Sequence, residues 1–92
     1  MRVCQLAQDR GRLIVPHCWK TGIGIAASVH LSAAIPHCPF IEFLPAEMSD
    51  SVLRSELVTE ELRFVDGRIP LPKKPGLGIE LNYDAVEKYR VG

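Results

Sequence analysis

One short segment of this 92-residue chain gathers side chains that can move protons, stack on a ligand and meet an anion. His17 is followed closely by Trp19, Lys20 and Thr21. An imidazole titrates near neutral pH and serves as a general acid or base. Trp19 can wall a pocket and Lys20 can meet an anion. A single histidine is more often a hydrogen-bonded structural residue, so the pattern leaves a structural and a catalytic role for His17 both open.

The second residue of interest is Glu42, which lies between Ile41 and Phe43 in an apolar run. A buried carboxylate costs free energy unless it is paired or neutralised. One interpretation is a satisfied ion pair, or a glutamate just past a strand end that faces solvent. The other is a carboxylic acid at the end of a sheet that donates a hydrogen bond to a ligand. The pattern alone favours neither.

A repeated Pro-His-Cys, at 16–18 and again at 36–38, raises the question of a zinc site. Adjacent His and Cys side chains diverge on an extended backbone. The two copies also flank a predicted helix about 16 Å long, which is too far for shared ligation. We therefore expect no metal ligands in this chain. The count of 3 cysteines is odd, and together with the lack of a signal peptide it favours reduced thiols in a cytoplasmic protein.

The elements that hold these residues follow from hydrophobic spacing and from helix and strand breakers. The stretch 3–7 predicts the last turns of a helix. The short apolar runs 12–15 and 40–44, bounded by Gly and Pro, predict buried parallel strands, and 25–35 predicts the helix that joins them. In such a βαβ unit the functional loops lie at the carboxyl ends of the strands, which is where His17 falls.

The second half of the chain has a different pattern. The stretch 50–57 predicts a short polar helix. Asp66-Gly67 between two β-prone runs predicts a hairpin over 62–71 with a type I′ turn, because that turn needs two positive φ angles. A short closing helix is expected over 84–89, with Asp84 as its N-cap.

Charge and composition exclude several classes of protein. Lys and Arg total 11, Asp and Glu total 11, and the hydrophobic fraction is 47%, which is ordinary for a folded soluble chain. There is no basic footprint for nucleic acid and no polybasic stretch for an anionic membrane. No apolar run approaches the roughly 18 residues that a membrane span needs. We expect neither a nucleic-acid nor a membrane partner.

Taken together, the sequence resembles the C-terminal part of the barrel domain in the mandelate racemase and muconate lactonizing enzyme family of the enolase superfamily. The resemblance is carried by the segments 15–27, 40–45, 66–72 and 75–80. It implies an α/β fold: about the last two βα units plus the tail of a modified (β/α) TIM-like barrel, followed by a β-hairpin and a short closing helix. Residues 1–47 would be the partial barrel, with its seventh and eighth strands, and 48–92 the C-terminal segment.

The resemblance also implies roles for individual residues. His17 would be the general base, or the acid that protonates a leaving hydroxyl, and Glu42 would hydrogen-bond the substrate carboxylate or enolate. Trp19, Lys20 and Thr21 would line the substrate pocket without a catalytic role. Family members stabilise the enolate with Mg²⁺, whose ligands would lie outside this chain.

The function implied is that of a C-terminal fragment of a Mg²⁺-dependent enzyme that abstracts the proton α to a carboxylate. We expect an acid-sugar dehydratase, a lyase acting on a small carboxylate or sugar acid, and inactive as this piece alone. A racemase or epimerase of a 2-hydroxy acid is the alternative within the family, and intact members are expected to be homo-oligomers. A non-catalytic small binding or structural module is the alternative outside enzymes.

Overall fold

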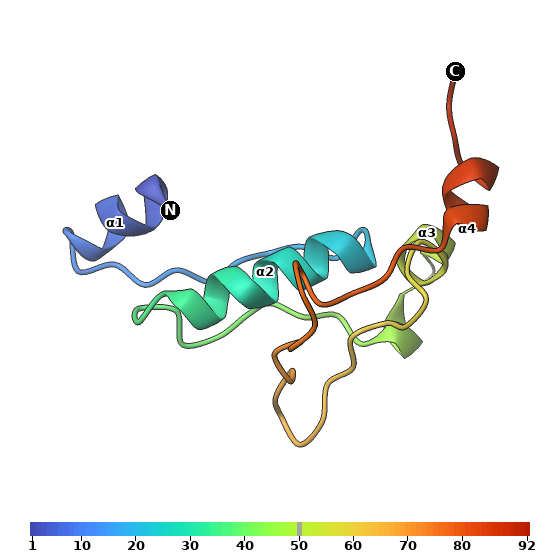
Figure 1. Ribbon diagram of the computed structural model, residues 1–92. Helices are drawn as coiled ribbons and strands as arrows, with labels where there is room; N and C mark the ends of the chain where they lie inside the picture. The colour runs from blue at the N-terminus through green and yellow to red at the C-terminus, as the bar shows by residue number, and fades with distance from the viewer. Residues whose placement is uncertain (50) are drawn as a thin grey trace.

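A computed structural model describes residues 1–49 and 51–92. Figure 1 shows a central helix, α2, with α1 near one of its ends and α3 and α4 near the other. Over the described residues, β-structure is limited to isolated bridges. The helices are α1 (Arg2–Gln8), α2 (Gly22–Ala34), a 3₁₀ helix (Ala46–Met48), α3 (Val52–Glu56) and α4 (Tyr83–Lys88).

Helix α2 is the main packing element, and it begins three residues before the predicted start at Ile25. The earlier start follows from Thr21, whose hydroxyl accepts a hydrogen bond from the Gly24 amide at 3.1 Å and so caps the first turn. The helix ends at Ala34 because the next residue precedes Pro36, and a residue before proline is pushed out of the helical region. Its buried residues include Ile25 and Val29.

The predicted strands at 12–15 and 40–44 are present only as extended segments. They run parallel and side by side as expected, but a single isolated bridge joins His17 to Glu42. The Glu42 amide donates to the Pro16 carbonyl at 3.0 Å. Pro16 has no N–H to give back, and over the described residues no further strand flanks the pair, so the ladder does not extend.

The predicted hairpin is confirmed at its turn. Asp66 and Gly67 have φ angles of 49° and 76°, as a type I′ turn requires. Val65 and Arg68 exchange two backbone hydrogen bonds, at 2.7 and 3.0 Å. Pairing stops there, so the hairpin is shorter than the 62–71 that was predicted.

The two short helices of the C-terminal half lie close to their predicted positions. Helix α3 falls within the predicted 50–57, of which Asp50 lies outside the described residues. Helix α4 begins at Tyr83, one residue early, because its N-cap is Asn82 and not Asp84. The Asn82 side chain accepts from the Ala85 amide at 3.3 Å, the N-cap to N3 geometry, whereas Asp84 lies in the first turn.

The buried core is small and much apolar surface is uncovered. The radius of gyration is 14.5 Å, whereas a compact domain of this length would have about 12 Å. Leu13 and Phe40, in the two extended segments, are 68% and 72% exposed. Over the described residues no helix is long and apolar enough to cross a membrane. The buried hydrophobic residues are Cys4, Ile25, Ala26, Val29, Ile35, Val58 and Ala85.

Candidate active site

The structure brings together His17 and Glu42, the two residues predicted to do chemistry. His17 Nδ1 lies 3.2 Å from Glu42 Oε1, and the backbones of the two residues form the parallel bridge. Their side chains are 59% and 48% exposed. Of the interpretations left open for Glu42, the structure therefore shows a carboxylate paired with a histidine on an open surface, not a buried one. An acid–base pair at adjacent ends of parallel segments can hold and transfer a proton.

Trp19 forms one side of this pair. Its ring centroid lies 4.5 Å from that of His17, with the planes tilted by 38°. Residues two apart on an extended backbone point to the same side, which places the indole beside the imidazole. The indole N–H is buried and has no hydrogen-bond partner among the described residues. Trp19 thus restricts where the His17 ring can turn, and its role as a pocket wall stays a prediction.

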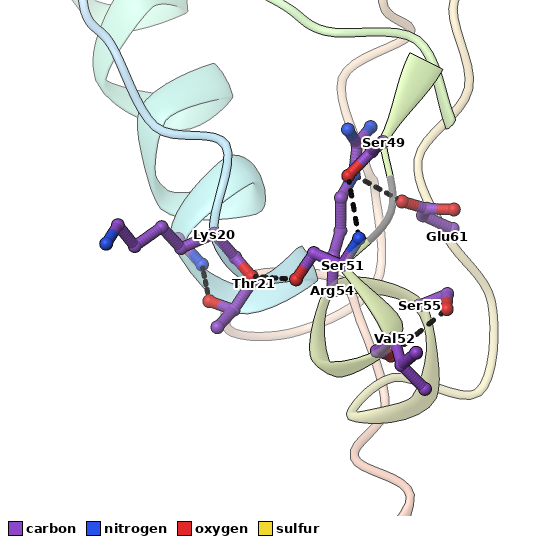
Figure 2. Close-up of polar contacts among 9 residues, drawn as sticks. Lys20, Thr21, Ser49, Ser51, Val52, Arg54, Ser55 and Glu61 are labelled. Atoms are coloured by element: carbon purple, nitrogen blue, oxygen red, sulfur yellow. Dashed lines mark hydrogen bonds and ion pairs between the residues drawn. The ribbon is translucent and has the colours of Figure 1, made fainter. Parts of the chain in front are cut away.

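Lys20 and Thr21, which were predicted to line the pocket, make contacts that join this segment to helices α2 and α3. The Thr21 hydroxyl is engaged as the N-cap of α2, so its observed contact is structural. The Lys20 carbonyl accepts a hydrogen bond from the Ser51 hydroxyl at 3.4 Å (Figure 2), while the residue itself is exposed. The backbone of this segment is thereby joined to the start of α3.

Behind the pair lies a buried ionic cluster that sequence reasoning missed. Arg54 in α3 is 1% exposed, and its Nε lies 2.5 Å from Glu61 Oε1 as a charged contact without hydrogen-bond alignment. Its guanidinium lies over the Phe43 ring, 5.3 Å from the centroid. An arginine in a short polar helix is expected to be exposed to solvent, so the sequence did not indicate that Arg54 is buried.

The other histidines join elements to one another. His30 Nε2 lies 3.0 Å from the Leu77 carbonyl, which ties α2 to the Pro-Gly-Leu-Gly segment. His37 Nε2 lies 2.9 Å from the Cys4 carbonyl, which ties the turn after α2 to α1. These contacts are structural.

The side chains present do not by themselves fit a divalent cation. Mg²⁺ prefers six oxygen ligands in near-octahedral geometry. Over residues 1–49 and 51–92, no group of three or more His, Cys, Asp or Glu residues is placed to hold a metal ion. The pair of His17 and Glu42 supplies one nitrogen and one carboxylate.

Comparison with known proteins gives this geometry a context. The chain is 36% identical to D-galactarolactone cycloisomerase of Agrobacterium fabrum, over 98% of this chain and 25% of that protein. It is 33% identical to D-xylonate dehydratase of Haloferax volcanii, over 85% of this chain and 18% of that protein. Among solved structures, that of 3,6-anhydro-D-galactonate cycloisomerase from Zobellia galactanivorans is 34% identical to this chain, with a TM-score of 0.79. The match covers 96% of this chain and 24% of the chain in that structure.

The chain thus spans about a quarter or less of the length of these relatives. Residues 1–86 match the family described as enolase C-terminal domain-like. That match covers nearly the whole chain and agrees with both the resemblance in the sequence and the neighbouring folds. The chain belongs to the mandelate racemase and muconate lactonizing enzyme family of the enolase superfamily, as a piece of its C-terminal domain.

Proposed function

We propose that this chain supplies the acid–base histidine and a carboxylate of an enzyme that abstracts the proton α to the carboxylate of a small sugar acid. The observation that carries the proposal is the approach of His17 Nδ1 and Glu42 Oε1 to 3.2 Å at adjacent ends of parallel segments. Relatives named as a sugar-lactone cycloisomerase and a sugar-acid dehydratase support the substrate class.

In this proposal His17 exchanges protons with the substrate through Nε2, because Nδ1 faces Glu42. Glu42 orients the ring and favours the tautomer with its proton on Nδ1. In a dehydration, His17 Nε2 takes the α proton as the C–H bond breaks, and an enolate forms. His17 then gives a proton to the departing β-hydroxyl, the C–O bond breaks, and water and an enol are released. The enol tautomerises to a 2-keto-3-deoxy acid.

We propose dehydration as the reaction, and epimerisation at the α-carbon as the alternative. Both begin with the same proton abstraction, and they differ only in whether a leaving group departs before the proton returns. The Mg²⁺ that the family generally uses would be held by ligands outside residues 1–92, and the 92-residue chain would then be inactive alone.

The test begins with the DNA upstream of Met1, which shows whether a longer in-frame product contains this chain. That product, or the 92-residue chain if there is none, is incubated with Mg²⁺ and a panel of aldonic and aldaric acids in D₂O. Proton NMR separates the outcomes: a keto-deoxy product indicates dehydration, and deuterium at an inverted α-carbon indicates epimerisation. His17→Asn is expected to abolish both, whereas Arg63→Gln, at an exposed site, is the control. Full turnover in His17→Asn would refute the acid–base role.

A further inference from the structure

We propose that Arg54 is a positioning residue of this site, which holds the segment carrying Glu42 against the segment carrying His17. The proposal rests on the proposed roles of His17 and Glu42. Arg54 touches neither of them, and it acts through Phe43 and through the backbone around α3.

Arg54 places a full charge in the interior of a small fold. Arg54 is the one charged residue among the fully buried side chains described, at 1% exposure, and its partner Glu61 is 13% exposed at the side chain. Figure 2 shows the guanidinium extending from α3 past Ser49, with Glu61 beside it. Burying an ion pair seldom adds stability compared with apolar residues of the same size. Stability alone therefore does not account for the presence of the pair.

The Arg54 side chain also contacts Phe43, the residue that follows Glu42. Successive side chains on an extended backbone point to opposite faces. Glu42 points toward His17, so Phe43 points away from the site, and its ring meets the Arg54 guanidinium at 5.3 Å. Arg54 therefore contacts the Glu42 segment from the face opposite the carboxylate. A cation held over an aromatic ring is attracted to the negative ring face, and more strongly when water is excluded.

The start of helix α3 also contacts the segment that carries His17. The Ser51 hydroxyl, just before α3, donates to the Lys20 carbonyl at 3.4 Å (Figure 2). At Gly22, a Cβ would lie only 3.2 Å from the Arg54 carbonyl oxygen, so the start of α2 approaches α3 as closely as a glycine permits. Helix α3 thus fixes both segments, and Arg54 is the side chain through which it reaches the second one.

The experiment measures this coupling without relying on activity. Amide hydrogen exchange of the 92-residue chain is followed by NMR at Glu42, whose N–H donates to Pro16, and at Val29 within α2 as the internal reference. Phe43→Leu removes the ring but keeps the ion pair. Arg54→Met with Glu61→Gln removes the pair without leaving a buried charge unpaired.

In both variants we expect exchange at Glu42 to rise about tenfold relative to Val29, the size that loss of a buried cation–π contact implies. Arg54→Lys, which keeps the charge, should recover part of the protection. Arg63→Met removes an exposed arginine and is expected to change neither amide.

Three results would overturn the proposal. The first is unchanged exchange at Glu42 in the two variants. The second is equal acceleration at Glu42 and Val29, because that marks a general loss of stability. The third is a Glu42 amide that is already unprotected in the unsubstituted chain. The two proposals can also fail separately. If exchange at Glu42 rises selectively in the variants but no form of the protein shows enzymatic turnover, the proposed function is refuted and the positioning role of Arg54 stands.

Discussion

The imidazole of His17 and the carboxylate of Glu42 meet at 3.2 Å although they belong to separate extended segments and both are about half exposed. A polar contact so open to solvent contributes little to stability. The pair is therefore brought together by the backbone bridge and by the packing behind it, and not by its own attraction. This separation of chemistry from stability can be measured.

Glu42→Gln is expected to change the free energy of unfolding by no more than about 0.5 kcal/mol, because the carboxylate is exposed. The matched substitution, Glu61→Gln, leaves the Arg54 charge buried without its counter-ion and should cost about 3 kcal/mol. Urea denaturation followed by circular dichroism compares the two. Similar losses in both variants would show that the site pair carries stability after all.

Gly22→Ala is expected to destabilise the chain by about 1–3 kcal/mol, because the new Cβ would overpack a rigid contact. It would lie 2.7 Å from Val58 Cγ2 and 3.2 Å from the Arg54 carbonyl oxygen. Gly24→Ala is the comparison and should cost less. The nearest atom to its new Cβ is the Cys18 sulfur, which lies at the end of a side chain that can rotate, and alanine favours the helix. Val58→Ala should relieve the Gly22→Ala cost, and additive losses would contradict the clash.

The contact between α3 and α4 should depend on pH through Glu56. Hydrogen bonds from Lys88 and then from Tyr89, each at 2.8 Å, lower the pKa of the Glu56 carboxyl below its ordinary 4.5. A carboxylate whose pKa is lowered by folding stabilises the folded state at pH values above its pKa in the unfolded chain. That contribution is lost as the pH falls through the pKa in the folded chain. The same hydrogen bond raises the pKa of Lys88, so the ammonium stays charged throughout this range.

Melting temperatures measured from about pH 3 to 6 should therefore fall more steeply toward acid in the unsubstituted chain than in Glu56→Gln. Glu47→Gln, at an exposed site in the 3₁₀ helix, is the control for the loss of a carboxylate. Parallel curves for Glu56→Gln and the unsubstituted chain would show that the contact does not form.

The sequence was sufficient where a local rule decides the outcome. Asp66-Gly67 predicts its turn because few other residue pairs adopt two positive φ angles. The helix before Pro36 and the parallel placement of His17 and Glu42 followed from breakers and from apolar runs. These signals lie within a few neighbouring residues.

Where tertiary contacts decide, the sequence was insufficient. Arg54 resembles any exposed helical arginine until Phe43 and Glu61, distant along the chain, enclose it. The strands were predicted from apolarity, yet an apolar run becomes a strand only when a neighbouring segment pairs with it over several residues. Leu13, at 68% exposure, shows that such a neighbour is missing over the described residues.

The last prediction separates the two roles considered for Thr21. As an N-cap, its hydroxyl satisfies the Gly24 amide, so Thr21→Val should cost about 1 kcal/mol of stability and lower the helical signal in circular dichroism. Thr21→Ser keeps the hydroxyl and should restore both. If instead Thr21 contacts substrate only, Thr21→Val would leave the unfolding midpoint unchanged. Thr59→Val, at an exposed site outside the helices, controls for the general effect of replacing a hydroxyl with a methyl group.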